Sequence, residues 1–375
     1  MALVKPDTTR LAKIRVIGVG GGGGNAINSM ISQDKISGVE FIAVNTDAQV
    51  LLSNLASTKV QVGEKLTRGL GVGGNHELGQ QAAEESREKI KELLLDSDMV
   101  FITAGMGGGT GTGAAPIIAE VAREVGALTI AIVTKPFAFE GARRAVVAEE
   151  GIEALKGKVD TLIIIPNQRL MDVIDRKVTL LDAFRLADSV LSQGVQGISE
   201  IITQPGLINV DFADVKAIMT QAGSALLGIG TGVGEARAQM AARAAISSPL
   251  LDLSIEGAKG VLFNISGGPD LTMAEVDEAA RIIAEHSDAD ANIIFGASID
   301  QRLSDQVRIT VIATGFDEAR ARLAQITQTA VKPQPTLEPT DETREENEEE
   351  EKTTEPKDDE FGERFEIPAF LRQGR

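Results

Sequence analysis

The stretch KIRVIGVGGGGGNA (13–26) decides the fold class, because an apolar run passes directly into a cluster of glycines. The run is typical of a buried strand, and the glycines open a segment with helical spacing. From Ala12 to about Phe316, short β-branched runs alternate with longer amphipathic segments. This alternation predicts an α/β fold with a parallel, Rossmann-like central sheet.

The expected elements fall into two sets. In the first, strands are expected over 13–19, 39–45, 98–104, 128–134 and 161–166, and helices over 77–95, 114–125, 143–155 and 180–203. After the break Gln204-Pro205-Gly206, helices are expected over 212–225, 236–246 and 273–285, and strands over 226–232, 260–266, 291–299 and 307–314. The second set predicts a smaller domain with its own sheet, which segment 180–203 connects to the first.

Composition excludes several classes of protein. The 375 residues suit two domains, and 37 basic against 55 acidic residues give a net charge of −18, which disfavours a nucleic-acid-binding surface. The chain has no cysteine and only two histidines, His76 and His286, so any catalytic metal is expected on oxygen ligands, with Mg²⁺ the natural candidate. Because neither a signal peptide nor a membrane span is recognisable, we expect a cytoplasmic protein without direct membrane insertion.

The C-terminal region has a different composition. Residues 338–360 contain 13 acidic and 3 basic residues, including EENEEEE (345–351), which predicts a solvated, self-repelling linker. The final FGERFEIPAFLRQGR (361–375) is apolar again and holds three of the twelve phenylalanines. This end is either frayed or a short peptide that binds partners, and we favour the second interpretation.

Three glycine-rich segments are candidates for binding phosphate. GVGGGGGNA (18–26) satisfies G-x-G-x-x-G, and GGGTGTG (107–113) follows a second expected strand and adds two hydroxyls, Thr110 and Thr112. Glycines let the backbone approach phosphates, and a helix N-terminus offers unpaired N–H groups. The third segment, RGLGVGGN (68–75), either covers a terminal phosphate or is a surface loop. No G-x-x-x-x-G-K-[ST] motif occurs, so the chain is not an ordinary P-loop NTPase.

These motifs carry a resemblance to a known family. GGGTGTG resembles the signature of the tubulin superfamily, and residues 10–320 resemble the FtsZ family of bacterial cell-division GTPases. AVNTDAQ (43–49), TKPFAFEG (134–141) and NVDFADV (209–215) occur in the same order, and IPAFLR (367–372) is similar to the family's tail peptide. The resemblance implies an N-terminal extension (1–11), a GTP-binding domain (12–178), a central helix (179–204), a GTPase-activating α/β domain (205–320), a disordered acidic linker (321–360) and a partner-binding peptide (361–375).

The same resemblance implies GTP or GDP and Mg²⁺ as cofactors. It assigns the following residues to GTP: Gly20, Gly21, Gly22, Gly23, Gly24, Asn25, Asn45, Asp47, Gly71, Gly73, Gly74, Gly107, Gly108, Gly109, Thr110, Gly111, Thr112, Gly113, Thr134, Glu140, Arg144, Asn167, Phe184 and Asp188. Mg²⁺ is expected on phosphates and water, with Asp47 helping through water. Asp188 suits guanine because a carboxylate accepts from its N1–H and N2–H₂, which adenine lacks.

Simpler interpretations stand beside these assignments. Phe184, one helical turn before Asp188, suits either the base or the core, and Asp188 either guanine or solvent. Glu140 and Arg144, assigned to ribose and phosphate, also match a plain i,i+4 ion pair.

The segment GLINVDFADV (206–215) holds the expected catalytic residues Asn209, Asp211 and Asp214. The spacing of the two acids alone predicts a capping box at a helix start. The resemblance implies that all three residues reach the nucleotide of the next subunit in a head-to-tail filament, where the acids position the attacking water.

The implied function is a GTPase that assembly activates and that forms the cytokinetic ring beneath the membrane at mid-cell. Membrane-tethering and regulatory division proteins are expected to bind the tail through Ile367, Pro368, Phe370, Leu371 and Arg372. Two alternatives remain. One is an NAD-dependent oxidoreductase with Glu40 at the ribose, which leaves GGGTGTG unexplained; the other is a structural homologue that does not hydrolyse GTP, against which the two acids argue.

The chain departs from the family pattern in the third glycine segment. Val72-Gly73-Gly74-Asn75-His76 stands where Ala-Gly-Ala-Asn-Pro is commoner. The backbone donors survive this change, but the loss of proline and the added glycine predict a more flexible loop. We expect altered turnover rather than lost binding.

Overall fold

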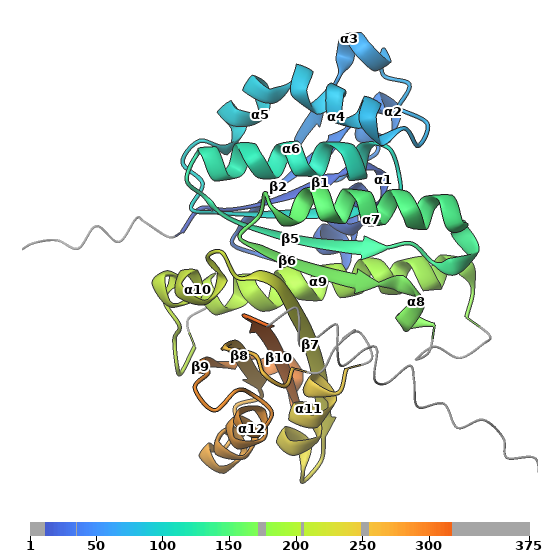
Figure 1. The fold of residues 1–375 in the computed structure, drawn as a ribbon. Coiled ribbons are helices and arrows are strands. Elements are labelled where there is room, and N and C mark those ends of the chain that lie inside the picture. The colour runs from blue at the N-terminus through green and yellow to red at the C-terminus, as the bar shows by residue number, and fades with distance from the viewer. Residues whose placement is uncertain (1–11, 35, 172–177, 204–205, 249–254, 317–375) are drawn as a thin grey trace, which may run out of the picture. The chain divides into compact units, whose positions relative to one another are not determined.

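The computed structural model describes residues 12–34, 36–171, 178–203, 206–248 and 255–316 (Figure 1). Residues 1–327 form one compact unit and residues 328–375 a second one, which lies entirely outside the described residues. The strands are β1 (Ile14–Val19), β2 (Val39–Asn45), β3 (Thr58–Gln61), β4 (Met99–Gly105), β5 (Leu128–Lys135), β6 (Thr161–Pro166), β7 (Gly223–Val233), β8 (Gly260–Gly267), β9 (Asn292–Ile299) and β10 (Gln306–Thr314).

The helices of the described residues alternate with these strands. They are α1 (Gly20–Ser29), α2 (Ala48–Leu52), α3 (Glu64–Thr67), α4 (His76–Glu85), α5 (Arg87–Leu94), α6 (Thr110–Glu124), α7 (Ala142–Lys156), α8 (Asn167–Leu170), α9 (Leu180–Thr203), α10 (Phe212–Met219), α11 (Arg237–Ile246) and α12 (Met273–Glu285). Short helical turns cover η1 (Met30–Asp34), η2 (Ala138–Glu140) and η3 (Gln301–Leu303). The expected α/β fold is confirmed.

The strand order is β3-β2-β1-β4-β5-β6-β7-β10-β8-β9. Strands β1 to β6 pair in parallel, and β1 lies between β2 and β4. The order of strands therefore reverses between β1 and β4, and in open α/β sheets ligands bind at this point, outside the carboxyl ends of the strands. The turns that leave β1 and β4 are the first two glycine segments.

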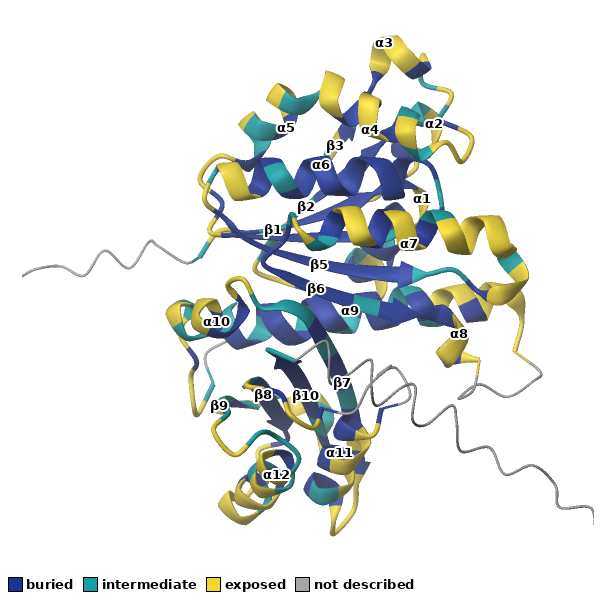
Figure 2. Ribbon diagram, in the orientation of Figure 1, coloured by how far each residue is buried: buried dark blue, intermediate teal, exposed yellow. Residues whose placement is uncertain are grey.

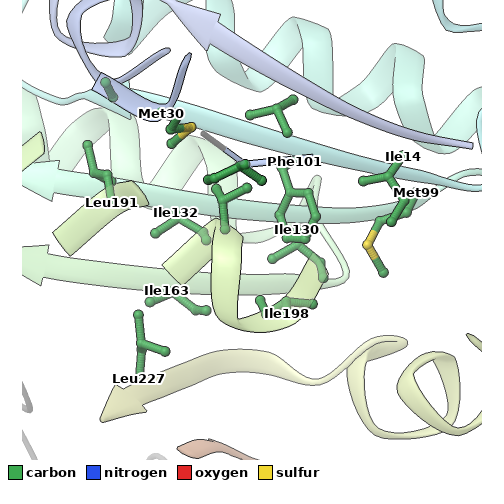
Figure 3. Packing of buried hydrophobic residues seen from close by; sticks show 14 of the residues in the cluster. Ile14, Met30, Met99, Phe101, Ile130, Ile132, Ile163, Leu191, Ile198 and Leu227 are labelled. Atoms are coloured by element: carbon green, nitrogen blue, oxygen red, sulfur yellow. The ribbon is translucent and has the colours of Figure 1, made fainter. Parts of the chain in front are cut away.

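Apolar residues on both faces of the strands build two cores. On one face Phe101, Ile130 and Ile132 pack against α9, together with residues of α1 (Figure 3). On the other face Val100 and Ile102 pack under α6. Helix α6 is buried along most of its length (Figure 2), because α4 and α5 pack against it as well. The first two glycine turns are thus carried by strands and helices that are packed on both sides.

Helix α9 connects the two parts of the compact unit, as expected. A Cβ added to Gly194 would lie 3.2 Å from Ile132 of β5 and 2.9 Å from Leu227 of β7. The helix therefore packs against both the parallel strands β1 to β6 and the strands that follow them. Its bounds are those predicted from the apolar spacing.

Three expected features of the fold are wrong. The helix predicted over 77–95 is broken at Ser86, whose hydroxyl accepts a hydrogen bond from Gly63 N at 3.2 Å. The helix predicted over 212–225 ends at Met219, because residues 223–225 pair with 161–163 of β6. For the same reason the second set of strands has no sheet of its own: β7 continues the first sheet and then pairs antiparallel with β10.

Candidate functional site

The first two glycine turns are in direct backbone contact. A Cβ added to Gly20 would lie 2.8 Å from Gly111 N, and one added to Gly22 would lie 3.2 Å from the Cα of Gly105. Gly20 also has φ +72°, a conformation that favours glycine. Any larger side chain at Gly20 would push the two turns apart, so glycine is required for the turns to meet.

Two helices begin at this junction without a side-chain cap. Neither α1, which starts at Gly20, nor α6, which starts at Thr110, has a side-chain cap on its first N–H groups. A Cβ added to Gly21 or Gly108 would meet no atom within 4 Å, so the exposed faces of both turns are open. Uncapped N-termini beside open glycines are the arrangement that binds phosphates.

The third glycine segment joins the same junction. Leu70 forms an isolated bridge with Asp47, and a Cβ on Gly109 would meet Val72 at 2.4 Å and Asn75 N at 3.2 Å. The segment is therefore anchored at both ends to the site. Between the anchors, Gly73 and Gly74 have positive φ and nothing within 4 Å of an added Cβ, so this part of the loop faces open space.

The hydroxyls of the second turn brace the protein itself. The hydroxyls of Thr110 and Thr46 are 2.7 Å apart, and the Thr112 hydroxyl accepts a hydrogen bond from Gly107 N at 2.9 Å. Both threonines are buried, as is Thr134, which lies at the end of β5. These hydrogen bonds connect the second turn to Thr46 and to the backbone of Gly107, and the contacts of Thr110 and Thr112 with phosphate stay a prediction.

Two polar residues after β2 organise the chain locally. The Asn45 side-chain oxygen accepts hydrogen bonds from Thr46 N at 2.8 Å and Asp47 N at 3.3 Å. Asp47 caps α2 through Oδ1, while its Oδ2 lies 3.9 Å from a Cβ placed on Gly71. The second carboxylate oxygen thus faces the loop over the phosphate turns.

No group of three or more acidic, histidine or cysteine side chains among the described residues could hold a metal ion. Asp47, whose second carboxylate oxygen faces the third glycine segment, is an oxygen donor of the kind that suits Mg²⁺.

Glu140 and Arg144 form the ion pair that their spacing predicts, at 2.6 Å. Glu140 also accepts a hydrogen bond from Phe137 N at 2.8 Å, and Arg144 Nε donates to the Gly107 carbonyl at 3.5 Å. The pair therefore holds the start of α7 against the second glycine turn. About half of the Arg144 side chain remains exposed, so it can reach a ligand.

Phe184 and Asp188 lie one turn apart on α9. The Phe184 ring packs edge-on against Phe137 and Phe139, whose rings stack with centroids 5.0 Å apart, and 38% of Phe184 is exposed. Burial raises the pKa of the Asp188 carboxyl to about 7. A carboxylate that has lost water in this way is stabilised by any ligand that donates N–H groups to it.

Two buried side-chain oxygens have no hydrogen-bond partner among the described residues, those of Thr103 on β4 and of Asn167. The side-chain oxygen of Asn167, at the start of α8 after β6, is buried and accepts no hydrogen bond there. Buried polar atoms are normally paired, so this oxygen is suited to a donor from a ligand. Asn25, on α1, is exposed. The residues present therefore fit a nucleotide.

The loop 206–215 lies at the other end of the sheet. Asp211 and Asp214 form the predicted capping box of α10, with N–H to carboxylate distances of 2.8 and 3.3 Å, and Asn209 accepts from Gly206 N at 2.5 Å. The Thr161 hydroxyl, at the amino end of β6, donates to the Met219 carbonyl of α10 at 2.6 Å. The glycine turns, in contrast, follow the carboxyl ends of β1 and β4.

The comparisons with known proteins agree with this geometry. Residues 13–175 match the GTPase domain of the Tubulin/FtsZ family, and residues 223–317 match the C-terminal domain of the FtsZ family. A solved structure described as an empty FtsZ dimer from M. jannaschii is 48% identical, with a TM-score of 0.79 over 83% of this chain and 90% of that one.

The chain belongs to the FtsZ family.

A more distant solved structure shares the fold alone. CetZ1 from Haloferax volcanii, solved as a GDP-bound monomer, is 20% identical with a TM-score of 0.71 over 85% of this chain and 99% of that chain. As an FtsZ-family GTPase this chain binds GTP and GDP, and the NAD-dependent oxidoreductase alternative is wrong.

The structure brings together most of the residues predicted for this FtsZ-family site, but not all of them. The three glycine segments, Asp47, Glu140 and Arg144 converge, while Asn209, Asp211 and Asp214 do not join them within one chain. The expected extension (1–11), linker (321–360) and tail peptide (361–375), with Ile367, Pro368, Phe370, Leu371 and Arg372, lie outside the described residues. No helix among the described residues is long and apolar enough to cross a membrane.

Sequence reasoning missed four residues of the site. Thr46 pairs with Thr110, Gly105 contacts Gly22, and the rings of Phe137 and Phe139 pack against Phe184. Thr46 lies inside the AVNTDAQ segment and both phenylalanines inside TKPFAFEG, so position within a recognised motif was the available signal.

Proposed function

We propose that the chain assembles head-to-tail into filaments and that GTP is hydrolysed where two subunits meet. The observation that carries the proposal is the separation of the two halves of the site along α9. Asp188 lies near the start of this helix and loop 206–215 follows its end, so the rise of 1.5 Å per residue over 15 residues separates them by roughly 22 Å. One subunit's acids reach a nucleotide only on a neighbouring subunit.

Each half of the site has its own task. The glycine turns bind the phosphates through backbone N–H groups, and Asp188 accepts hydrogen bonds from guanine. Asp211 and Asp214 of the next subunit hold and polarise the attacking water, helped by Asn209. Mg²⁺, held by phosphates, water and Asp47, supplies charge neutralisation at the phosphates. Loss of the terminal phosphate weakens the neighbouring contact between subunits, so the nucleotide state sets the lifetime of the filament.

A heterologous contact that does not close into a ring produces a filament. An FtsZ structure at 48% identity is described as a dimer, which supports self-association as a property of close relatives. We therefore propose that these filaments form the cytokinetic ring at mid-cell. Attachment beneath the membrane is then supplied by adaptor and regulatory proteins that bind residues 367–372.

The test is phosphate release from GTP with Mg²⁺ across a series of protein concentrations, with ATP as control. We expect a GTP-only rate that appears above a threshold concentration. Asp211→Asn keeps a good N-cap, whereas Asp211→Ala removes it, so both variants must lose activity if the charge acts in catalysis. Loss in the alanine variant alone would reduce Asp211 to a structural cap.

Mixing two inactive variants tests whether the site is shared. Asp188→Ala lacks the guanine contact but keeps its acids, and Asp211→Asn keeps its nucleotide site. If the acids act on the neighbouring subunit, the mixture regains part of the activity, because an Asp188→Ala subunit can supply Asp211 to a nucleotide-loaded neighbour. A mixture as inactive as its components, or a rate proportional to concentration from the lowest value, would place the whole site in one chain.

A further inference from the structure

His76 is the first residue of α4 and directly follows the glycines of the third segment. Its Nε2 lies 3.6 Å from Oε2 of Glu150 on α7. The two side chains are 34% and 56% exposed, so the contact lies at the surface but is not fully solvated. It connects the end of loop 68–75 to a helix that packs on the second glycine turn.

His76 follows the part of the loop that faces open space, and Leu70, Val72 and Asn75 anchor the loop to the site on either side of that part. Gly73 and Gly74 contact nothing through an added Cβ, and Asn75 caps α4 by accepting from Leu78 N at 3.0 Å. The His76 carbonyl lies 2.0 Å from a Cβ placed on Gly113, so the start of α4 presses on the first turns of α6. The free part of the loop ends at this packed point.

The backbone of α7 around Glu150 is packed closely against the second glycine turn. The next residue, Gly151, has room for no Cβ because the Thr112 methyl group would lie 2.2 Å away. One helical turn and a half earlier, the Arg144 carbonyl lies 2.6 Å from a Cβ placed on Gly107. Glu150 therefore has a fixed place relative to the second glycine turn, and a tie from it to His76 fixes the loop relative to that turn.

Glu150 is the charged side chain that lies within ion-pair distance of the His76 imidazole. On α7, Glu149 pairs with Lys135, and Arg144 pairs with Glu140. Two further charged residues of this helix are Arg143, seven residues before Glu150, and Glu153, three residues after it. On α6 the first charged residue is Glu120, which pairs with Arg87 and Lys158. On α3, Glu64 pairs with Lys89 and Lys65 is the other charge, and on α4 the neighbouring acid is Glu77.

We propose that His76 is a positioning residue whose protonated imidazole pairs with Glu150 and holds loop 68–75 over the terminal phosphate. The proposal rests on the proposed function, in which this loop contacts GTP. Only the cationic imidazole makes an ion pair with a carboxylate, so loss of the ring's proton removes the tie. Proline, expected here from the family pattern, would fix the helix start at every pH.

The experiment measures how fast a fluorescent GTP analogue leaves the full-length protein between pH 5.5 and 8.5, below the assembly threshold. Wild type is compared with His76→Gln, Glu150→Gln and the double variant. Glu153→Gln is the matched control, because it removes an exposed carboxylate from the same helix with the same change in net charge. His76→Lys keeps a cation at every pH.

In wild type we expect the ratio of dissociation rates at pH 8.5 and pH 5.5 to exceed that of either glutamine variant by roughly two- to fivefold, the range of a partly exposed ion pair. The double variant behaves as the singles do, Glu153→Gln as wild type, and His76→Lys retains slow dissociation at pH 8.5. Any titration of Asp188 is common to all variants and cancels in the comparison.

Parallel pH profiles for wild type, His76→Gln and Glu150→Gln would overturn the proposal, as would a Glu153→Gln profile that matches Glu150→Gln. These measurements use unassembled chains. A failure of the filament mechanism, seen as phosphate release without a concentration threshold, is therefore distinguishable from a failure of the tie.

Discussion

At the scale of the residue, Asp188 is the side chain whose surroundings say most about its role. Burial raises the pKa of its carboxyl to about 7. The ionised form of an acid in such surroundings is unfavourable in the nucleotide-free protein. It becomes favourable when a ligand donates hydrogen bonds to the carboxylate. The ring of Phe184, packed against two others, lies one turn away on the same helix.

Asp188→Asn should stabilise the nucleotide-free protein in a pH-dependent way. Because the pKa in the folded state lies above the unfolded value, the folded chain retains a proton that the unfolded chain loses, and burial of Asp188 costs stability increasingly between about pH 4 and 7. Above pH 7 we expect the variant to gain up to about 4 kcal/mol in free energy of unfolding, and to gain nothing near pH 4. Urea unfolding followed by circular dichroism, with nucleotide removed, measures this.

The same substitution should weaken GTP binding at every pH, since the carboxylate acceptor is gone. A stability difference that does not change with pH would show that the carboxyl is already ionised and paired in the folded protein. Unchanged GTP affinity would remove Asp188 from the guanine site.

At the scale of the element, glycines decide how closely helix and strand approach. On β7, a Cβ at Gly228, Gly230 or Gly232 would lie within 2.1 Å of a backbone oxygen of α11. Backbone atoms of a packed helix cannot move aside as a flexible side chain can. The alternate glycines of this strand therefore set the distance between β7 and α11, and with it the packing of a further core, in which Ala241 and Ala245 of α11 lie with Val307 and Ile309 of β10.

Gly230→Ala should destabilise the protein by about 3 kcal/mol or more, because its Cβ would meet the Ala241 carbonyl oxygen at 2.0 Å. Gly157→Ala is the matched control: its φ is −78° and no atom lies within 4 Å of an added Cβ. We expect the control to change stability by less than about 1 kcal/mol. Equal midpoints of thermal unfolding for the two variants would show that α11 can move away from β7 at little cost.

At the scale of the whole molecule, one strand makes a single sheet out of two sets of strands. Residues 223–225 of β7 pair in parallel with β6, and the rest of the strand pairs antiparallel with β10. Helix α9 packs against both parts, so a change at one end of the sheet has a continuous packed path to the other. The residues proposed to bind GTP and those proposed to hydrolyse it lie at opposite ends of this continuous structure.

Deleting residues 366–375 should leave the GTPase rate and its concentration threshold unchanged, because these residues belong to the second unit of the chain. We expect the same deletion to abolish binding of membrane-tethering adaptor proteins. Co-sedimentation of filaments with an adaptor measures this, and Phe370→Ala with Leu371→Ala is the point-substitution counterpart. Undiminished co-sedimentation of the truncated chain would place adaptor binding elsewhere.

The sequence by itself determined the features that depend on neighbours along the chain. Apolar spacing predicted both ends of α9, the strand-to-glycine transition at residues 13–26 predicted the turn between β1 and α1, and the spacing of Asp211 and Asp214 predicted the capping box. Each depends on periodicity or on hydrogen bonds between residues a few positions apart, which a single sequence displays.

Only the tertiary structure decided the rest, because the contacts join residues far apart in the chain. Ser86 interrupts a helix and accepts a hydrogen bond from Gly63, and the hydroxyls of Thr46 and Thr110 form a hydrogen bond. Helix α10 ends before the predicted position because residues 223–225 of β7 pair with β6. Local spacing carries no information on such contacts. The placement of the glycine turns and of the acids proposed for catalysis at opposite ends of one sheet has the same origin, since strand order and direction are properties of the folded chain.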